Sequence, residues 1–277
     1  MQQRSMAISP AEYESFKSFL QDACGILLGN GKEYLVSSRL NGIMKEMNVA
    51  SLSELTKLIK SPAQARLKVR VIDAMTTNET FWFRDIGHFI LLKETILPDL
   101  NQQRGGSIRI WSAACSSGQE SYNISMIAED YQNQKGTGRP VQIQATDISS
   151  KVLEEARNGG YCGLSVERGL TLDQQKRYFL TRDKCLEVKP EIKRRVSFRS
   201  QNLAESYQSL GRFDVIFCRN VLIYFSNDLK KDIVERMANA LNPGGYLFLG
   251  STESLNQVTN RFEMKVGHGG ISYRLKG

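Results

Sequence analysis

Polar and charged residues follow successive apolar segments of this chain, and their types suit the binding of a nucleoside. Each apolar segment is followed by a helical pattern or by a turn, which is the alternation of an open parallel sheet. Ligands of such sheets bind beyond the carboxyl ends of the strands, so residues at these places are expected to share one site. The candidates are Glu120, Asp147, Asn202, Arg219 and Asn220.

The first of these loops, "SAACSSGQE" at 112–120, begins like a phosphate-binding corner but does not have its composition. It contains one glycine, Gly118, where a dinucleotide fingerprint has three. The N-terminus of a helix attracts anions, and the Glu120 carboxylate at the start of the following helix would occupy this place and repel a pyrophosphate. A ligand with a positively charged end would be attracted instead. The loop therefore favours S-adenosylmethionine, whose amino and sulfonium groups are positive, over NAD.

Two further candidates match the rest of such a cofactor. The Asp147 carboxylate can accept two hydrogen bonds from ribose hydroxyls. It comes 29 residues after Gly118, a longer separation than the roughly 20 residues of a dinucleotide fingerprint. The alternative is that Asp147 caps the helix that follows it. Asn202 carries an amide that can both donate to and accept from an adenine edge.

The elements that must position these residues fall into two parts. Residues 9–75 contain four helical patterns, the first of which opens with Ser9 and Glu12 and ends at Gly25. After a polar and aromatic stretch and a helix at 89–103, strands alternate with helices. The expected strands lie at 107–111, 141–147, 195–202, 213–220, 245–250, 262–266 and 272–275. The last two form a hairpin at one edge, and two short alternating runs before residue 195 form a small inserted β-subdomain.

Composition places limits on the class of protein. The chain has 277 residues, of which 41% are hydrophobic, and it contains no apolar run of the roughly 18 residues that a membrane helix needs. The N-terminal segment lacks the apolar core of a signal peptide. Five cysteines, an odd number without a C-x-x-C pair, argue against a disulfide framework and a structural zinc site. We expect a cytoplasmic protein without a metal.

The net charge of +8 allows nucleic acid, an anionic membrane or an acidic protein as a partner, or simply a solvated surface. Residues 1–75 hold 10 Lys/Arg and 7 Asp/Glu, a net of +3, and residues 165–200 hold 10 and 5, a net of +5.

Five segments in order and spacing give the chain a specific resemblance. They are "TTNETFWFR", "RIWSAACSSGQESYNI", "ATDIS", "FCRNVLIYF" and "NPGGYLFLG". Together they resemble the chemotaxis receptor glutamate methyltransferases, the CheR family, over nearly the whole chain. The resemblance implies an α/β fold: a Rossmann-like S-adenosylmethionine methyltransferase sheet with a terminal antiparallel hairpin, a β-subdomain insertion and an N-terminal helical bundle. The implied domains are 1–75, a linker at 76–90 that contributes to the site, and 91–277 with the insertion at about 165–198.

The resemblance also implies a reaction and its residues. The reaction is methyl-ester formation on glutamates of receptor signalling helices, with S-adenosyl-L-methionine as cofactor and S-adenosyl-L-homocysteine as product. The implied catalytic residues are Arg84, which would hold the substrate carboxylate, and Tyr224, near the transferred methyl group; helix capping and packing are the alternatives for these two. The implied cofactor contacts are Asn78, Thr80, Arg84, Glu120, Asp147, Asn202, Leu203, Arg219 and Asn220.

The chain departs from the family pattern at two places. Gln119 stands where the family often has the first of two acids, and we expect cofactor binding to survive because Glu120 is retained. The insertion is compact, and "YFLTRDKCLEVKPEIKRRV" contains no glycine. We therefore expect no tight binding of a receptor C-terminal pentapeptide, which a longer, glycine-rich insertion binds in some members.

The basic N-terminal domain is then expected to lie against acidic, coiled-coil receptor helices, so that the protein meets the membrane only through its receptor. The candidate contacts are Arg39, Lys45, Arg66, Lys68 and Arg70.

Two other functions compete with this interpretation. The positive charge favours a nucleic-acid methyltransferase. Methylation of base amino groups typically uses a proline-containing turn after the fourth strand, and methylation of cytosine C5 needs a nucleophilic cysteine that commonly follows a proline. This chain has no proline in that turn and Cys218 follows Phe217, so we expect no nucleic-acid partner. A non-enzymatic sensor of S-adenosylmethionine is opposed by Asn78, Arg84 and Tyr224. The aromatic residues Phe81, Trp82 and Phe83 are expected to pack in the core.

Overall fold

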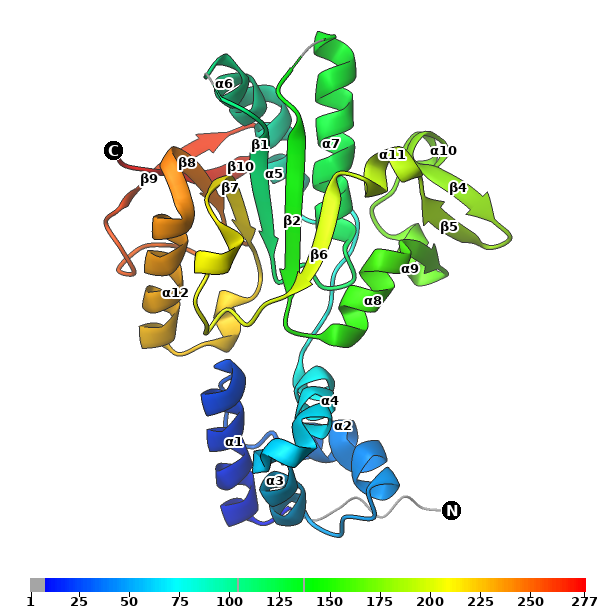
Figure 1. Ribbon diagram of the computed structural model, residues 1–277, viewed down its shortest axis with the longest axis vertical. Coiled ribbons are helices and arrows are strands. Elements are labelled where there is room, and N and C mark those ends of the chain that lie inside the picture. Colours follow the sequence, from blue (N-terminus) through cyan, green and yellow to red (C-terminus); the bar gives the residue numbers. More distant parts are fainter. Residues whose placement is uncertain (1–7, 104, 137) are drawn as a thin grey trace. The chain divides into compact units, whose positions relative to one another are not determined.

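The computed structural model describes residues 8–103, 105–136 and 138–277, and these form two compact units (Figure 1). The first unit comprises the chain up to Thr77 together with Tyr224–Leu229. The second comprises Asn78–Ile223 and Lys230–Gly277. Residues 1–7 of the expected N-terminal domain lie outside the described residues.

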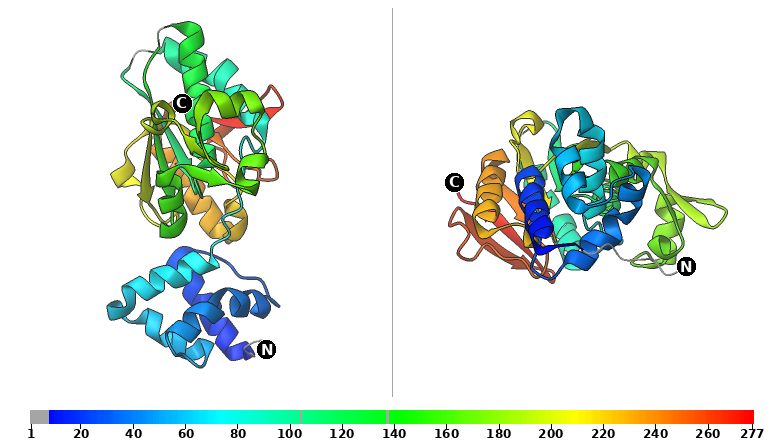
Figure 2. Two further views of the ribbon diagram at one scale, coloured as in Figure 1. Left: turned by 90° about the vertical axis from the view of Figure 1, so that its right-hand side faces the viewer. Right: turned by 90° about the horizontal axis from the view of Figure 1, so that it is seen from below.

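The described part of the N-terminal unit is helical, as the sequence predicts (Figure 2). Its helices are α1 (Pro10–Cys24), α2 (Glu33–Glu46), α3 (Leu52–Lys60) and α4 (Ala65–Met75), with a 3₁₀ turn η1 (Pro62–Gln64) before α4. Apolar residues three and four apart bury one face of each helix against the others. The fully buried positions include Phe16, Leu20, Leu40, Leu55 and Val71.

The ends of α1 follow the sequence signals. The Ser9 side chain accepts a hydrogen bond from the Glu12 N–H, and the Glu12 carboxylate accepts one from the Ser9 N–H. This reciprocal pair satisfies donors that the first helical turn leaves free. Gly25 ends the helix in the left-handed conformation, with φ +77°.

The second unit contains a seven-stranded sheet in the order β6-β2-β1-β7-β8-β10-β9. Strands β6, β2, β1, β7 and β8 are parallel, β10 is antiparallel to β8, and β9 is antiparallel to β10. The chain thus adds a terminal hairpin to a Rossmann-like sheet, as the sequence predicts. The strands are β1 (Ile108–Ala113), β2 (Val141–Asp147), β6 (Val196–Ser200), β7 (Phe213–Cys218), β8 (Leu241–Phe248), β9 (Phe262–Gly267) and β10 (Gly270–Leu275).

Helices connect the strands, and α7 and α12 flank the sheet in Figure 1. The helical elements are α5 (Ile86–Leu91), the π turn η2 (Leu92–Ile96), α6 (Leu97–Gln102), α7 (Gln119–Lys135), α8 (Ser150–Asn158), η3 (Gln208–Leu210), η4 (Leu222–Tyr224) and α12 (Asn227–Ala240). The expected helix 89–103 is thus interrupted by a π turn. Pro98 lies just after this turn and has no N–H to donate to it, which relaxes the regular hydrogen-bond spacing.

A separate antiparallel sheet of three strands, in the order β3-β5-β4, forms the inserted subdomain, to the side of the main sheet in Figure 1. Its elements are β3 (Gly160–Cys162), α9 (Leu164–Glu167), α10 (Leu172–Tyr178), β4 (Phe179–Arg182), β5 (Cys185–Val188) and α11 (Pro190–Lys193). The small sheet begins at Gly160, before the expected insertion at 165–198, and Val196 already belongs to the main sheet. The short strand β3 has no periodic signal in the sequence.

The cysteines correct one expectation. Cys162 and Cys185 are directly opposite each other on β3 and β5, and the structure joins them in a disulfide. The sequence gives no indication of this bond, because an odd number of cysteines without a close pair argues against disulfides in general. Cys24, Cys115 and Cys218 are buried free thiols.

The aromatic linker packs between the two sheets of the second unit. Trp82 is fully buried, with its ring edge-on to Tyr161 and Phe179 of the small sheet. Its indole N–H donates to the Ser165 carbonyl at 2.7 Å. Phe83 packs against Phe89. The expectation that these aromatic residues pack in the core is confirmed for Trp82 and Phe83. It is wrong for Phe81, which is only half-buried and lies under the Arg168 guanidinium.

Among the described residues, no helix combines the length and the apolar character needed to cross a bilayer.

Candidate functional site

The predicted site residues of the second unit gather at the carboxyl ends of four neighbouring strands. The register pairs Ala113 at the end of β1 with Thr146 on β2 and with Cys218 on β7, and it pairs Asp147 with Ser200 on β6. The segments that follow these strands therefore leave the sheet at one edge. This is the place where ligands of open parallel sheets bind.

The loop after β1 turns back on itself through three left-handed residues. Ala114, Ser116 and Gly118 have φ values of +57°, +50° and +94°. A Cβ atom on Gly118 would lie 2.9 Å from the Cβ of Ala156 in α8. The single glycine of the loop is thus required by the close approach of α8, and no further glycine is needed for a phosphate.

Glu120 lies in the first turn of α7, and both of its carboxylate oxygens are held from the sheet. The Ser112 hydroxyl of β1 donates to Oε1 at 2.7 Å, and Arg219 Nη1, after β7, donates to Oε2 at 2.9 Å. The Ser121 hydroxyl donates to Ser112 at 3.0 Å and so completes the chain. The carboxylate is therefore fixed in orientation before any ligand binds.

Arg219 connects Glu120 with the linker. Its Nη2 lies 2.6 Å from Asp85 Oδ2 and 2.6 Å from the Arg84 carbonyl oxygen, and only 3% of the side chain is exposed. Two carboxylates thus share one buried guanidinium, which leaves a surplus of negative charge. The sequence reasoning placed the attraction for a cation on Glu120 alone. In the structure the charge of Glu120 is shared with Arg219, and Asp85 supplies the additional carboxylate.

Asp85 is ionised at neutral pH. Burial acts to raise the pKa of its carboxyl, but the hydrogen bond and the positive charge of Arg219 outweigh burial, and the net effect lowers that pKa. Asp85 and Phe83 both have positive φ values, +55° and +51°. Such conformations persist where surrounding contacts hold them, and Arg219 supplies these contacts at Arg84 and Asp85.

His88 is buried beside this group, with its ring 5.4 Å from that of Phe248. Burial, together with the positive charge of Arg219, lowers the pKa of the imidazole to about 4, although Asp85 acts in the opposite direction. The ring is therefore neutral at neutral pH.

Asp147 holds two backbone segments together at the end of β2. Its Oδ2 accepts the N–H of Ser116 at 2.8 Å, and its Oδ1 accepts the N–H of Ser149 at 2.9 Å. Ser149 is the N-cap residue of α8, so Asp147 closes the turn that leads into this helix. The same carboxylate also fixes the loop after β1, which places it among the residues expected to bind the cofactor.

The linker residues Asn78, Thr80 and Arg84 lie in the second unit, and backbone contacts position them. The Ser116 hydroxyl donates to the Asn78 carbonyl at 2.8 Å. Arg84 Nη1 donates to the Glu79 carbonyl at 3.3 Å. The linker is thus attached to the loop after β1, and Thr80 is half-buried. The contribution of the linker to the site stays a prediction.

Beyond β6, Asn202 closes a turn of its own. Its amide oxygen accepts the Ala204 N–H at 3.0 Å, which adds a structural role to the expected contact with adenine. Leu203 is buried, and its carbonyl accepts the Tyr207 hydroxyl at 2.6 Å. Beyond β7, Asn220 has φ +58° and donates its N–H to Glu253.

Tyr224 lies in the other compact unit. It ends η4, is half-buried, and its carbonyl accepts the Leu27 N–H at 2.8 Å within the N-terminal unit. Its expected role near the transferred methyl group therefore stays a prediction.

Sequence reasoning missed two residues that support this site. Asp85 follows the candidate Arg84 directly. An acidic residue within an aromatic linker was the sequence signal that could have identified it. The Tyr161 hydroxyl of β3 donates to the Ser117 carbonyl in the loop after β1 at 2.7 Å. Burial raises the pKa of Tyr161 well above its usual value, so the hydroxyl remains a donor. No sequence pattern marks Tyr161.

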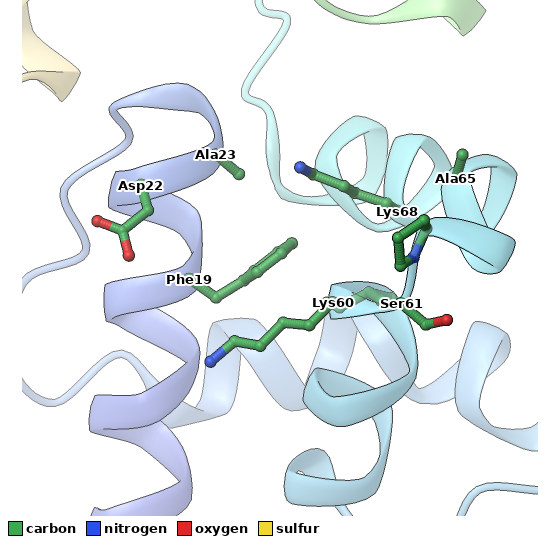
Figure 3. A pocket seen from close by; sticks show the side chains of 9 residues that line it. Phe19, Asp22, Ala23, Lys60, Ser61, Ala65 and Lys68 are labelled. Carbon is green, nitrogen blue, oxygen red and sulfur yellow. The ribbon is translucent and has the colours of Figure 1, made fainter.

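A pocket in the N-terminal unit contains none of the expected cofactor contacts. It has a volume of about 570 Å³ and lies between α1, α3 and α4. Figure 3 shows the Phe19 ring with the side chains of Lys60 and Lys68 on either side of it. The Lys68 ammonium lies 5.9 Å from the centre of the Phe19 ring. The pocket thus presents an aromatic surface beside two cations, with Asp22 on its wall.

The basic residues expected to contact a partner are in different surroundings. Arg39 Nη1 donates to the carbonyls of Met75 and Thr76 at the end of α4, at 2.7 and 2.9 Å, so this guanidinium serves as a helix cap. Arg70 forms a two-pronged ion pair with Glu46 on the surface.

The polar and charged side chains at the strand ends fit S-adenosylmethionine. Negative charge from Glu120 and Asp85 lies beside the start of α7, where a cationic amino-acid end would be placed. Asp147, at the end of the next strand, and the turn at Asn202 and Leu203 are the residues expected from the sequence to hold the ribose and the base. Glu120 and Asp147 are held by hydrogen bonds from other residues of the site, so the arrangement is formed in advance of binding.

Two protein-family models match the chain. The model described as "CheR methyltransferase, all-alpha domain" matches residues 11–76, and the one described as "CheR methyltransferase, SAM binding domain" matches residues 78–270.

Individual relatives match over nearly the full length. The chain is 48% identical over 275 residues to "Chemotaxis protein methyltransferase 1" of Pseudomonas aeruginosa, which covers 98% of this chain and 100% of the relative. It is 46% identical to "Chemotaxis protein methyltransferase Cher2" of Pseudomonas putida, with 98% and 100% covered. It is 47% identical to "Chemotaxis protein methyltransferase 1" of Vibrio cholerae, with 98% and 99% covered.

Proposed function

Because the chain belongs to the CheR methyltransferase family, we propose that it methylates glutamate side chains on the cytoplasmic signalling helices of chemoreceptors and so acts in sensory adaptation. S-adenosylmethionine is the cofactor of this domain. The observation that supports the proposal is the buried arrangement of Glu120, Arg219 and Asp85, which attaches the linker residue Arg84 to the edge of the sheet where we propose that the cofactor binds.

A carboxylate acceptor needs little acid–base catalysis. A free glutamate has a pKa of about 4.3, so it is already an anionic nucleophile at neutral pH. The cofactor supplies a methyl group on a positively charged sulfur. The residues of the chain then have to align the carboxylate with this methyl group and exclude water from it. The proposed reaction therefore needs no nucleophile–base pair. Of the two histidines, His88 is buried and His268 is exposed.

Arg84 and Tyr224 are the residues proposed to orient the acceptor. Arg219 holds the Arg84 carbonyl, which fixes the backbone from which the Arg84 guanidinium extends. A charge-assisted hydrogen bond from Arg84 would hold the substrate carboxylate. For Tyr224, the proposed role is that its hydroxyl orients the acceptor. The product is S-adenosylhomocysteine and a neutral methyl ester, whose weaker attraction to Arg84 favours its release.

The proposed partner surface is the basic side of the N-terminal unit. Receptor methylation helices are acidic, and Lys60 and Lys68 flank the pocket beside Phe19. Of the residues expected from the sequence, Arg39 is used within the fold, so Lys45, Arg66, Lys68 and Arg70 remain the proposed contacts.

We also propose that the small sheet does not bind a receptor C-terminal pentapeptide tightly. The turn between β4 and β5 contains only Asp183 and Lys184, which gives the short hairpin little surface for a peptide. Isothermal titration calorimetry with such a pentapeptide is expected to give no micromolar binding. The place of action is proposed to be the cytoplasm, where receptor signalling domains lie.

The test is transfer of a radiolabelled methyl group to receptor-rich membranes, with release of the label by mild base. We expect base-labile label from the wild type and loss of most turnover in Arg84→Ala. Base-stable label would indicate a different acceptor atom, label in nucleic acid would indicate a base methyltransferase, and cofactor binding without any transfer would indicate a sensor. Near-wild-type turnover in Arg84→Ala would remove Arg84 from the mechanism.

A further inference from the structure

One carboxylate joins the turn after β7 to the loop after β8. Glu253 Oε2 accepts the N–H of Asn220 at 2.7 Å and the N–H of Gly250 at 2.8 Å. Its other oxygen, Oε1, accepts the N–H of Leu222 at 3.0 Å. Three backbone donors from two segments thus converge on a single side chain.

The position of Glu253 follows from the sheet. Strands β7 and β8 are neighbours, and their parallel pairing ends at Phe217 and Phe248. Beyond this pair the two chains separate, so their backbone N–H groups have no partner on the adjacent strand. The Glu253 carboxylate fills this separation. Hydrogen bonds to an ionised acceptor are stronger than those between neutral groups, which suits a place where regular pairing has ended.

The turn held in this way has an uncommon backbone conformation. Asn220 is left-handed, with φ +58°, a conformation that asparagine tolerates better than most other non-glycine residues. The hydrogen bond from the Asn220 N–H to Glu253 holds the turn in this conformation. The neighbouring Arg219 is the residue whose guanidinium reaches Glu120 and Asp85, so the direction of the turn determines where this guanidinium lies.

Close packing leaves the turn little freedom. A Cβ atom on Gly250 would lie 2.5 Å from Asn220 Nδ2 and 2.8 Å from Glu253 Oε2. The Asn220 amide therefore rests directly against the backbone of Gly250. Glu253 also closes its own turn, because its N–H donates to the Gly250 carbonyl at 2.9 Å.

We infer that Glu253 is a positioning residue for methyl transfer: it fixes the turn that presents Arg219 and Asn220 to the cofactor and that continues into η4. Glu253 acts through these residues and needs no contact with the cofactor. The inference rests on the proposed function for its effect on methyl transfer. Its effect on cofactor binding depends only on the S-adenosylmethionine domain.

Glu253→Gln tests this inference, because it keeps the length of the side chain and replaces one acceptor oxygen with an NH₂ group that faces backbone donors. With the loss of a charged acceptor, the dissociation constant for S-adenosylhomocysteine is expected to rise about tenfold. We expect KM for S-adenosylmethionine to rise with it. Calorimetry and steady-state methyl transfer measure the two quantities at a temperature where circular dichroism shows the variant to be folded.

Glu235→Gln is the matched control. Glu235, on α12, accepts the Thr259 hydroxyl at 2.6 Å and an Arg261 N–H at 3.3 Å, so it anchors the same loop segment away from the β7 turn. This substitution is expected to lower the melting temperature without changing the dissociation constant. Equal losses of affinity in both variants, or wild-type affinity and KM in a folded Glu253→Gln protein, would overturn the inference.

Gly250→Ala gives a second test if Glu253→Gln does not fold. Its methyl group would press on both the Asn220 amide and the Glu253 carboxylate and so displace the turn without removing the charge, and affinity is again expected to fall about tenfold if the turn determines binding. Unchanged affinity would contradict the inference. Because calorimetry uses no methyl acceptor, it decides the role of Glu253 even if the wild-type protein fails to methylate receptors, which would refute the proposed function alone.

Discussion

Arg219 and Glu120 are 99 residues apart in the chain, and Arg219 Nη1 lies 2.9 Å from Glu120 Oε2 in the interior of the second unit. The same guanidinium holds Asp85 and the Arg84 carbonyl. One buried cation thus joins the ends of β1 and β7 to the linker. We expect both the stability of the unit and the shape of the proposed cofactor site to depend on it.

Arg219→Ala is expected to destabilise the protein by about 3–5 kcal/mol, because it leaves two carboxylates without their buried partner. S-adenosylhomocysteine binding should weaken at the same time. Urea denaturation and calorimetry measure the two effects. The control is Arg182→Ala, which removes an exposed ion pair with Glu187 and is expected to cost less than about 1 kcal/mol. Similar losses in the two variants would contradict the importance assigned to Arg219.

His88 predicts a specific loss of stability in acid. Its pKa is about 4 in the folded protein and near 6.5 in the unfolded chain. Between these values the unfolded state binds the proton and the folded state does not, so the free energy of unfolding falls as pH drops from about 6.5 to 4. The full difference corresponds to about 3 kcal/mol.

His88→Asn should reduce this dependence on pH, as measured by urea denaturation between pH 7 and 4. The matched control is His268→Asn, at an exposed turn where φ is +50°, a conformation that asparagine tolerates. This control should keep the wild-type profile. An unchanged profile in His88→Asn would mean that other groups cause the acid sensitivity.

Two arginines of the N-terminal unit, Arg39 and Arg66, are expected to respond differently to substitution, although they contribute the same charge to the composition. Arg39→Ala should lower the melting temperature, because its guanidinium satisfies carbonyl groups at the end of α4. Arg66→Glu should instead raise KM for the receptor with little change in melting temperature, and this KM should become less sensitive to salt. Thermal denaturation and methylation assays at several salt concentrations separate the two. An unaltered receptor KM in Arg66→Glu would exclude this surface from recognition.

The disulfide predicts a difference that depends on reductant. Without reductant, iodoacetamide added after denaturation should label Cys24, Cys115 and Cys218 only, and peptide mass spectrometry identifies the labelled sites. Replacing both Cys162 and Cys185 with serine should then lower the free energy of unfolding by about 3 kcal/mol. The same comparison in dithiothreitol should show a much smaller difference. Labelling of Cys162 in the unreduced protein would show that the bond does not form.

Much of the fold follows from local patterns. Apolar runs that alternate with helical periods predicted the parallel strands, and the glycine-rich turn before β10 predicted the terminal hairpin. The positions of Glu120, Asp147 and Arg219 followed as well, because residues after parallel strands lie at one edge whatever their separation in the chain. The cap of α1 by Ser9 and Glu12 was also local and was predicted from the sequence.

The contacts that shape the site were not predictable in this way. Whether Arg219 contacts Asp85, or Glu253 contacts Asn220, depends on how loops from distant strands approach one another. The periodicity of apolar residues in the sequence does not predict such contacts. The pairing of Cys162 with Cys185 depends on the register of a sheet whose first strand has three residues. Arg39 carries the same charge as its surface neighbours, and only tertiary structure shows that it points inward.

Tyr161 belongs to the small sheet, yet its hydroxyl donates to a carbonyl of the loop after β1, and its neighbour Cys162 is covalently joined to β5. An attempt to transplant the insertion of another family member into this chain would therefore exchange part of the support of the cofactor loop as well. Chimeras that retain Tyr161 should keep cofactor affinity better than those that replace it. In this chain the inserted sheet and the loop after β1 therefore form one connected structural unit.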